Sequence, residues 1–241
     1  MPDPAILVIG AGDATGGAIA RRFAREGFVA CVVRRNADRL DPLVATITAE
    51  GGRAVAFGAD ARDEDQINVL IDRIENEIGP IEVAVFNIGA NVRFPLGETT
   101  SRVFRKVWEM ACFAGFLTGR AVAGPMQARG RGTILFTGAT ASLRGGSGFA
   151  AFAAAKFGLR ALAQSMAREL GPAGIHVAHI VIDGAIDTAW IAENFPESHA
   201  LKDRDGILNP EHIAETYWQV HRQERTAWTH ELDLRPWIET F

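Results

Sequence analysis

A glycine-rich run near the N-terminus has the residue types and the spacing that bind phosphate. It reads Gly10-Ala11-Gly12-Asp13-Ala14-Thr15-Gly16 and follows directly on the apolar residues 5–9. Glycine permits a sharp turn at the end of a strand, and small residues at Ala14 and Gly16 let a pyrophosphate approach the N-terminus of the next helix. An ordinary glycine-rich turn would read similarly, but the position between an apolar run and a helical pattern favours a nucleotide site. The residues expected to hold the nucleotide are Gly10, Gly12, Ala14, Thr15 and Gly16.

Two arginines at the end of the second apolar run indicate which dinucleotide binds. Arg34 and Arg35 follow residues 28–33, and the first acid after them is Asp38. A carboxylate at this point would bind a ribose 2′-hydroxyl and repel a 2′-phosphate, whereas arginine favours the phosphate. We therefore expect NADP(H) rather than NAD(H), with the alternative that both arginines are solvated loop residues.

The elements that must position these residues alternate regularly along the chain. Apolar runs predict strands at residues 5–9, 28–33, 53–57, 81–86, 133–137, 176–182 and about 228–232. Helical spacing predicts helices at residues 37–50, 63–78, about 101–129, 150–170 and after Pro210. Strands that are apolar throughout and separated by helices are typical of a parallel sheet covered on both faces. The predicted fold class is α/β, a single doubly wound Rossmann domain over residues 1–241 with about seven mostly parallel strands.

Composition excludes several classes of protein. The 241 residues carry a formal net charge of −4 with the 25 lysines and arginines scattered, which argues against nucleic acid as a partner. Cys31 and Cys112 lie far apart in apolar segments without nearby histidine, so neither a metal site nor a disulfide is expected. No apolar stretch has the length of a membrane span or the flanks of a signal peptide, and we expect a cytoplasmic protein. The single tyrosine, Tyr217, lies on the apolar face of the helix after Pro210 and is expected in the core.

These motifs together resemble the short-chain dehydrogenase/reductase family over nearly the whole chain. The resemblance rests on the glycine loop, Asp60, the Phe-Asn-Ile-Gly sequence at 86–89, Lys156, the run at 168–177 and the Asp-Gly-Ala-Ile-Asp-Thr sequence at 183–188. It implies an oxidoreductase acting on a small molecule, built as a homodimer or homotetramer that pairs through its two long helices. The cofactor contacts that it implies are Asp60 and Ala61 near the adenine, Asn87 and Gly89, Lys156 at the ribose, and Gly184, Ile186 and Thr188 at the nicotinamide.

The catalytic positions depart from the family pattern. Family members use a tyrosine as the proton donor, a lysine four residues later, a serine thirteen residues earlier and an asparagine in the preceding long helix. Here the tyrosine position is Phe152, the serine position is Ala139, and the asparagine position falls on Ala111. Phenylalanine has no ionisable group, and a positioned acid contributes about 10²- to 10⁴-fold to the rate. Lys156 remains, with a role at the ribose hydroxyls.

Other residues are candidates to replace the tyrosine. Asp183 stands where the family has proline, at the end of the sixth predicted strand, so it is a candidate acid, although Asp more often caps a turn. Weaker candidates are Thr140 and Ser142 beside Ala139, and His179 on the sixth predicted strand. Arg93 and Arg144 lie in loops that in such folds overhang the pocket, where they either select an anionic substrate or are simply solvated.

Two functions remain open on this sequence. One is an NADP(H)-dependent oxidoreductase that acts on a small carbonyl or alcohol with non-standard proton transfer, and the other is a catalytically inactive NADP(H)-binding sensor or regulatory or assembly partner. The nicotinamide turn favours the enzyme, since a pure binder has less need to hold that end of the cofactor. Residues 186–209, which carry no motif, are expected to cover the substrate.

Overall fold

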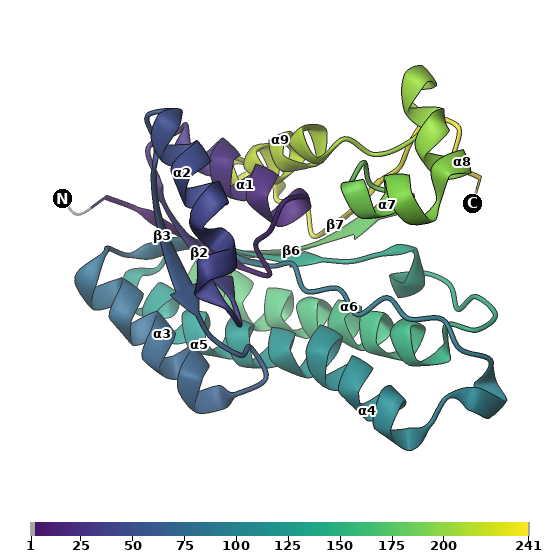
Figure 1. Cartoon of the computed structure of the whole chain (residues 1–241). Helices are drawn as coiled ribbons and strands as arrows, with labels where there is room; N and C mark the ends of the chain where they lie inside the picture. The colour runs from purple at the N-terminus through teal and green to yellow at the C-terminus, as the bar shows by residue number, and fades with distance from the viewer. Residues whose placement is uncertain (1–2, 241) are drawn as a thin grey trace.

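A seven-stranded, fully parallel sheet forms the centre of the computed structural model, which describes residues 3–240 (Figure 1). The strands are β1 (Ala5–Ile9), β2 (Val29–Arg34), β3 (Arg53–Gly58), β4 (Ile81–Phe86), β5 (Gly132–Thr137), β6 (Ile175–Ile182) and β7 (Glu231–Leu234). Their order is β3-β2-β1-β4-β5-β6-β7, so the direction of winding reverses between β1 and β4. In open α/β sheets, ligands bind beyond the carboxyl ends of the strands at such a reversal. The predicted fold class is confirmed.

Helices cover both faces of the sheet (Figure 1). They are α1 (Thr15–Ala24), α2 (Asp41–Ala49), α3 (Glu64–Glu77), α4 (Ser101–Trp108), α5 (Ala114–Arg129), α6 (Ala150–Leu170), α7 (Ala189–Asn194), α8 (Pro196–His199) and α9 (Pro210–His221). One core cluster joins the sheet to α1, α2 and α9, and a second joins it to α3, α5 and α6. Every residue of β1 is buried because its side chains pack alternately into these two clusters.

Three predicted elements differ from the structure by more than two residues. The helix expected at 37–50 begins with the 3₁₀ turn Ala37–Leu40 before α2. The helix expected at 101–129 is interrupted by a π-helical turn, Glu109–Phe113, which separates α4 from α5. Single π-helical turns of this kind occur often at functional sites. The last strand begins at Glu231 rather than near Trp228, because the Trp228 indole donates to the Gln223 carbonyl at 3.2 Å and stacks on His176.

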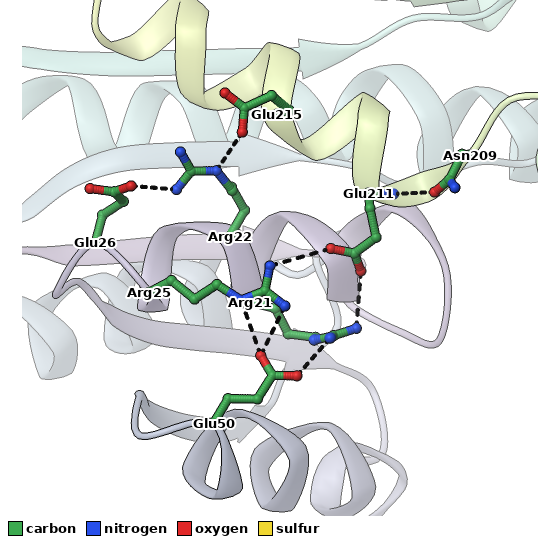
Figure 2. Close-up of polar contacts among 8 residues, drawn as sticks. All are labelled: Arg21, Arg22, Arg25, Glu26, Glu50, Asn209, Glu211 and Glu215. Atoms are coloured by element: carbon green, nitrogen blue, oxygen red, sulfur yellow. Dashed lines mark hydrogen bonds and ion pairs between the residues drawn. The ribbon is translucent and has the colours of Figure 1, made fainter.

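Ion pairs attach the C-terminal helix α9 to the first helix. Figure 2 shows Arg21 of α1 between Glu211 of α9 and Glu50, with N–O distances of 3.0 and 2.6 Å. Arg22 pairs with Glu215 of α9 at 2.6 Å. Half-exposed pairs such as these each stabilise by about 0.2–1 kcal/mol, so the apolar contact between the two helices carries most of the association.

The single tyrosine lies in the core cluster that α9 shares with the sheet. Tyr217 is fully buried, and its hydroxyl lies 2.7 Å from Thr137 Oγ1 at the end of β5. Burial raises the pKa of this phenol well above its ordinary value. The prediction that Tyr217 is a core residue is confirmed. Among residues 3–240, no helix combines the length and the apolar character needed to cross a bilayer.

Candidate active site

The glycine loop between β1 and α1 forms a close-packed cradle. Gly10 has φ = +88°, and a Cβ at this position would lie 2.9 Å from the Asn87 carbonyl oxygen. A Cβ at Gly16 would lie 2.6 Å from the Gly10 carbonyl oxygen, and one at Gly17 would lie 2.0 Å from that of Gly12. Only glycine fits these three positions, so the N-terminus of α1 is held directly against the loop.

The groups in this cradle fit a dinucleotide. Thr15 Oγ1 is buried without a hydrogen-bond partner among the described residues, and it lines a cavity of about 800 Å³. Arg34 lines the same cavity, with a guanidinium nitrogen 3.8 Å from where a Gly12 Cβ would lie. The orphaned hydroxyl and the helix N-terminus together form an anion site of the kind a pyrophosphate requires, and the Arg34 guanidinium adds a positive charge next to it.

Most of the predicted site residues meet in this one cavity. Those that line it are Gly10, Gly12, Ala14, Thr15, Gly16, Arg34, Asn87, Gly89, Ala139, Phe152, Lys156, Gly184 and Ile186. Thr188 does not line it, because its hydroxyl accepts from the Ile191 N–H at 3.1 Å and caps α7. Ala111 is buried in the π-helical turn and does not line the cavity either.

A smaller cavity of about 180 Å³ adjoins the loop on the side of β2 and β3 and is lined by Arg34, Arg35, Asp60 and Ala61. Asp60 accepts from the Arg62 guanidinium at 2.9 and 2.5 Å, and this pairing lowers the pKa of the carboxyl. The cavity contains the residues expected at the adenine and at the 2′ position, with both arginines on its wall.

Lys156 lines the large cavity beside Phe152. Its Nζ donates to the backbone carbonyls of Thr137 at 2.9 Å and Ile88 at 3.2 Å. The Phe152 ring centroid lies 5.9 Å from Nζ. Burial lowers the pKa of Lys156 to about 8, because the charged ammonium is removed from water. The cavity lining therefore includes an ammonium group with a pKa of about 8.

The hydroxyls next to Ala139 are engaged in structural contacts. Ser142 is fully buried, and its Oγ accepts from the Ala139 N–H at 3.1 Å rather than lining the cavity. Thr140 does line the cavity, and its Oγ1 donates to Asp183 Oδ1 at 2.6 Å. Asp183 itself is fully buried behind the cavity wall, with Arg144 at 3.5 Å and Arg235 at 3.8 Å from its oxygens.

The histidines of β6 lie away from the cavity. His179 is fully buried, and its Nδ1 lies 3.0 Å from Glu231, which is paired in turn with Arg160. Burial lowers the pKa of His179 to about 4, so the imidazole stays neutral at physiological pH. His176 Nε2 lies 2.8 Å from the Thr229 carbonyl oxygen under the Trp228 ring. Both are core residues.

Two backbone carbonyls and one further glycine also shape the site, and none of them is among the predicted site residues. The carbonyls of Ile88 and Thr137 fix Lys156, and the close approach at Gly17 fixes the loop. A backbone carbonyl is present at every residue, so no sequence signal identifies the two that bind Lys156. Gly17, in contrast, follows Gly16 directly at the start of α1, and two consecutive glycines in a helix indicate a close backbone contact.

Comparisons with known proteins agree with this geometry. The family profile described as short chain dehydrogenase matches residues 4–198. A short-chain dehydrogenase from Rhodopseudomonas palustris superimposes with a TM-score of 0.84 at 52% identity, covering 97% of this chain and 99% of that one. A metagenomic short-chain oxidoreductase in complex with NADP gives a TM-score of 0.82 at 25% identity, covering 97% and 96% of the two chains.

A named relative also matches most of the chain. The 1-deoxy-11-beta-hydroxypentalenate dehydrogenase of Streptomyces exfoliatus is 31% identical over 224 residues, which is 92% of this chain and 80% of the relative. The nucleotide cradle, the cavity beyond the strand ends and these similarities lead to one assignment. This chain belongs to the short-chain dehydrogenase family of nicotinamide-dependent oxidoreductases.

Proposed function

We propose that the protein is an NADP(H)-dependent enzyme that interconverts a small carbonyl compound and its alcohol, with Phe152 and Ala139 at the family's tyrosine and serine positions. The observation that carries the proposal is that Lys156 and the glycine loop line the same cavity. Arg34 and Arg35 at the end of β2 support the choice of NADP(H), because their guanidinium groups suit a 2′-phosphate.

Each part of the site would then hold one part of the cofactor. The glycine loop and Thr15 bind the pyrophosphate, Asp60 and Ala61 border the adenine, and Lys156 reaches the ribose of the nicotinamide. Gly184 and Ile186 line the wall at the nicotinamide end. When bound, the nicotinamide supplies or accepts a hydride.

Lys156 is the group that we assign to proton transfer. Of the titratable residues that line the cavity in the described chain, Asp13 and Arg34 lie at the glycine loop, Arg144 lies in the loop after β5, and Lys156 lies beside Phe152. Two of its N–H groups are bound to carbonyls, which leaves the third for a ribose hydroxyl, and that hydroxyl would pass the proton on to the substrate oxygen. In reduction, the substrate oxygen would receive this proton, and the neutral amine of Lys156 would be reprotonated from water.

Residues 186–209 are proposed to cover the substrate. Ile186 pairs with Leu208 in a parallel bridge, and Asp187 pairs with Lys202 at 2.7 Å and His199 at 3.2 Å, so the two ends of the segment are held together. Trp190 and Phe195 lie exposed on it with ring centroids 5.4 Å apart. The Streptomyces relative is named for a hydroxypentalenate, which is the anion of a hydroxy acid. A substrate of that chemistry, a carboxylate that bears an alcohol or a ketone, is therefore included in the panel below.

The test is NADPH oxidation against a panel of aldehydes, ketones and oxo acids, followed by absorbance. We expect at least one compound to be reduced. If NADPH binds but no compound is reduced, the result would contradict the proposed enzyme and favour a cofactor-binding sensor. If neither NADPH nor NADH binds, the result would contradict both functions.

Asp183 is expected to be dispensable for proton transfer. The variant Asp183→Asn keeps an oxygen for the Thr140 hydroxyl but has no ionisable group. Because the carboxyl is buried behind the cavity wall, kcat should stay within about threefold of wild type. Steady-state kinetics with saturating NADPH measures this, and a loss of about 100-fold, the size expected for a catalytic acid, would return the role to Asp183.

An apolar face on α4, α5 and α6 supports a homo-oligomer. Phe104, Trp108, Phe116 and Phe157 are each between 37% and 41% exposed, and rings of Trp108, Phe113 and Phe116 stack in series. Exposed aromatic clusters of this kind are usual at subunit interfaces. We propose that this face pairs two copies of the chain.

Charge at this face should prevent pairing. The double variant Phe116→Glu/Phe157→Glu is expected to show the 26.0 kDa mass of one chain by light scattering, whereas wild type shows at least twice that mass. The control is Val69→Glu, which replaces a residue that is 66% exposed on α3 and should leave the mass unchanged. A monomeric wild type, or an unaltered double variant, would contradict the interface.

A further inference from the structure

We propose that Arg144 binds an anionic group of the substrate, so that the enzyme acts on an apolar molecule that carries a carboxylate. This inference rests on the function proposed above and names the substrate class for the same cavity. It depends on the position of Arg144, on the charged groups around it and on the other residues that line the same cavity.

The position of Arg144 is set by the turn after β5. Its backbone N–H donates to the Thr140 carbonyl at 3.1 Å, directly after the 3₁₀ turn Thr140–Ser142. The side chain lines the cavity and remains 44% exposed. Within the described chain its one side-chain partner is Asp183, at 3.5 Å from a guanidinium nitrogen, so most of its N–H donors are available to a ligand.

Asp183 pairs with the Arg144 guanidinium but leaves most of its N–H donors without a partner in the described chain. The same carboxylate oxygen, Oδ1, accepts a short bond of 2.6 Å from Thr140, and Oδ2 faces Arg235 at 3.8 Å. A fully buried carboxylate requires compensation by cations and hydrogen bonds, which keeps Arg144 on this side of the cavity. Because the Arg144 contact is long, the planar fork of the guanidinium is left to pair with a second, stronger acceptor such as a carboxylate.

Most other side chains that line the cavity beyond the glycine loop are apolar, whereas those of Lys156, Thr140 and Asn91 are polar. The apolar ones include Ala139, Ala141, Phe149, Phe152 and Ile186. Among the described lining residues, the only acid is Asp13, which lies in the glycine loop, so no lining carboxylate at the Arg144 end repels an anion. Arg34, the other lining arginine, lies beside that loop and is committed to the cofactor. Arg144 and the mostly apolar lining around it therefore favour an apolar substrate that carries one negative charge.

Binding of a matched pair of ligands tests the inference without turnover. The probes are 3-phenylpropionate and the uncharged 3-phenylpropanamide, titrated calorimetrically into protein saturated with NADPH and into protein without it. Wild type is expected to bind the carboxylate about 10-fold more tightly than the amide, the scale of one charge-assisted hydrogen bond at a partly exposed site. In Arg144→Gln the two ligands should bind equally.

Arg93→Gln is the matched control. Arg93 is exposed on the rim, with its guanidinium 5.7 Å from the Phe149 ring, and it does not line the cavity. This variant should keep the preference for the carboxylate. Equal binding of both ligands by wild type, no binding of the carboxylate, or a preference that survives in Arg144→Gln would each overturn the inference.

NADPH fluorescence in the same samples separates this inference from the proposed function. If NADPH binds and the carboxylate is not preferred, the inference fails and the proposed cofactor is retained. If NADPH does not bind but Arg144 still confers the preference, the anion site stands and the proposed enzyme is wrong.

Discussion

Replacing Lys156 with methionine is expected to lower kcat by about 10²- to 10⁴-fold, the range for loss of a positioned acid. Methionine fills much of the same volume but cannot donate a proton to a substrate beside Phe152. The ribose contact is lost as well, so we expect NADPH affinity to fall by about 10-fold, as for one hydrogen bond to a charged group. Single-turnover kinetics at saturating NADPH separates the two effects.

The loss should not arise from unfolding. Burial lowers the pKa of Lys156 from 10.5 to about 8, so the ammonium is less favourable in the folded protein than in the unfolded chain. This difference destabilises the fold by roughly 3 kcal/mol below the folded pKa, and the penalty fades as pH rises from about 8 to the unfolded value. Two hydrogen bonds to carbonyls offset part of it.

Lys156→Met should therefore be at least as stable as wild type at neutral pH, with the difference shrinking toward about pH 10. Urea unfolding of both proteins at the two pH values measures this. A variant that is folded and retains the wild-type kcat would show that Lys156 is not the proton donor.

The double variant Arg34→Ala/Arg35→Ala is expected to remove the preference for NADP(H). We expect wild type to bind NADPH at least about 100-fold more tightly than NADH, since the two arginines at the end of β2 would form charge-assisted bonds to the 2′-phosphate. In the variant, NADPH affinity should fall by about the same factor while NADH affinity stays nearly constant. Titration of nicotinamide fluorescence gives all four dissociation constants.

An informative control is Arg39→Ala. Arg39 lies exposed a few residues after β2, and it lines neither of the two cavities that the cofactor would occupy. This variant should bind both cofactors as wild type does. Equal affinity of wild type for NADPH and NADH would refute the assignment of the arginines.

The fold and the cofactor end of the site follow from local patterns in the sequence. Most strands are largely apolar runs, although β7 alternates acids with leucines, and the glycine loop is recognised by its place between β1 and α1. Lys156 is found because it lies four residues after Phe152 on one helix. These signals depend on neighbouring residues, so a sequence displays them directly.

The substrate end could not be predicted in the same way. The Lys156 contact to Ile88 joins residues 68 positions apart, and Arg144 meets Asp183 across 39 positions. Which of two arginines, Arg93 or Arg144, lines the cavity depends on how the loops after β4 and β5 fold together. Thr188 shows the same dependence, because its hydroxyl caps α7 instead of lining the cavity. Long-range packing decides these roles, and residue type alone does not.

The most direct test of the central claim, that Lys156 replaces the tyrosine as proton donor, is the pH dependence of kcat for carbonyl reduction by wild type. The ammonium form donates the proton, and burial places its pKa at about 8. With NADPH and substrate saturating, kcat should be level below about pH 8 and fall about tenfold per pH unit above it. A kcat that stays level to about pH 10, where the amine is neutral, would contradict the assignment.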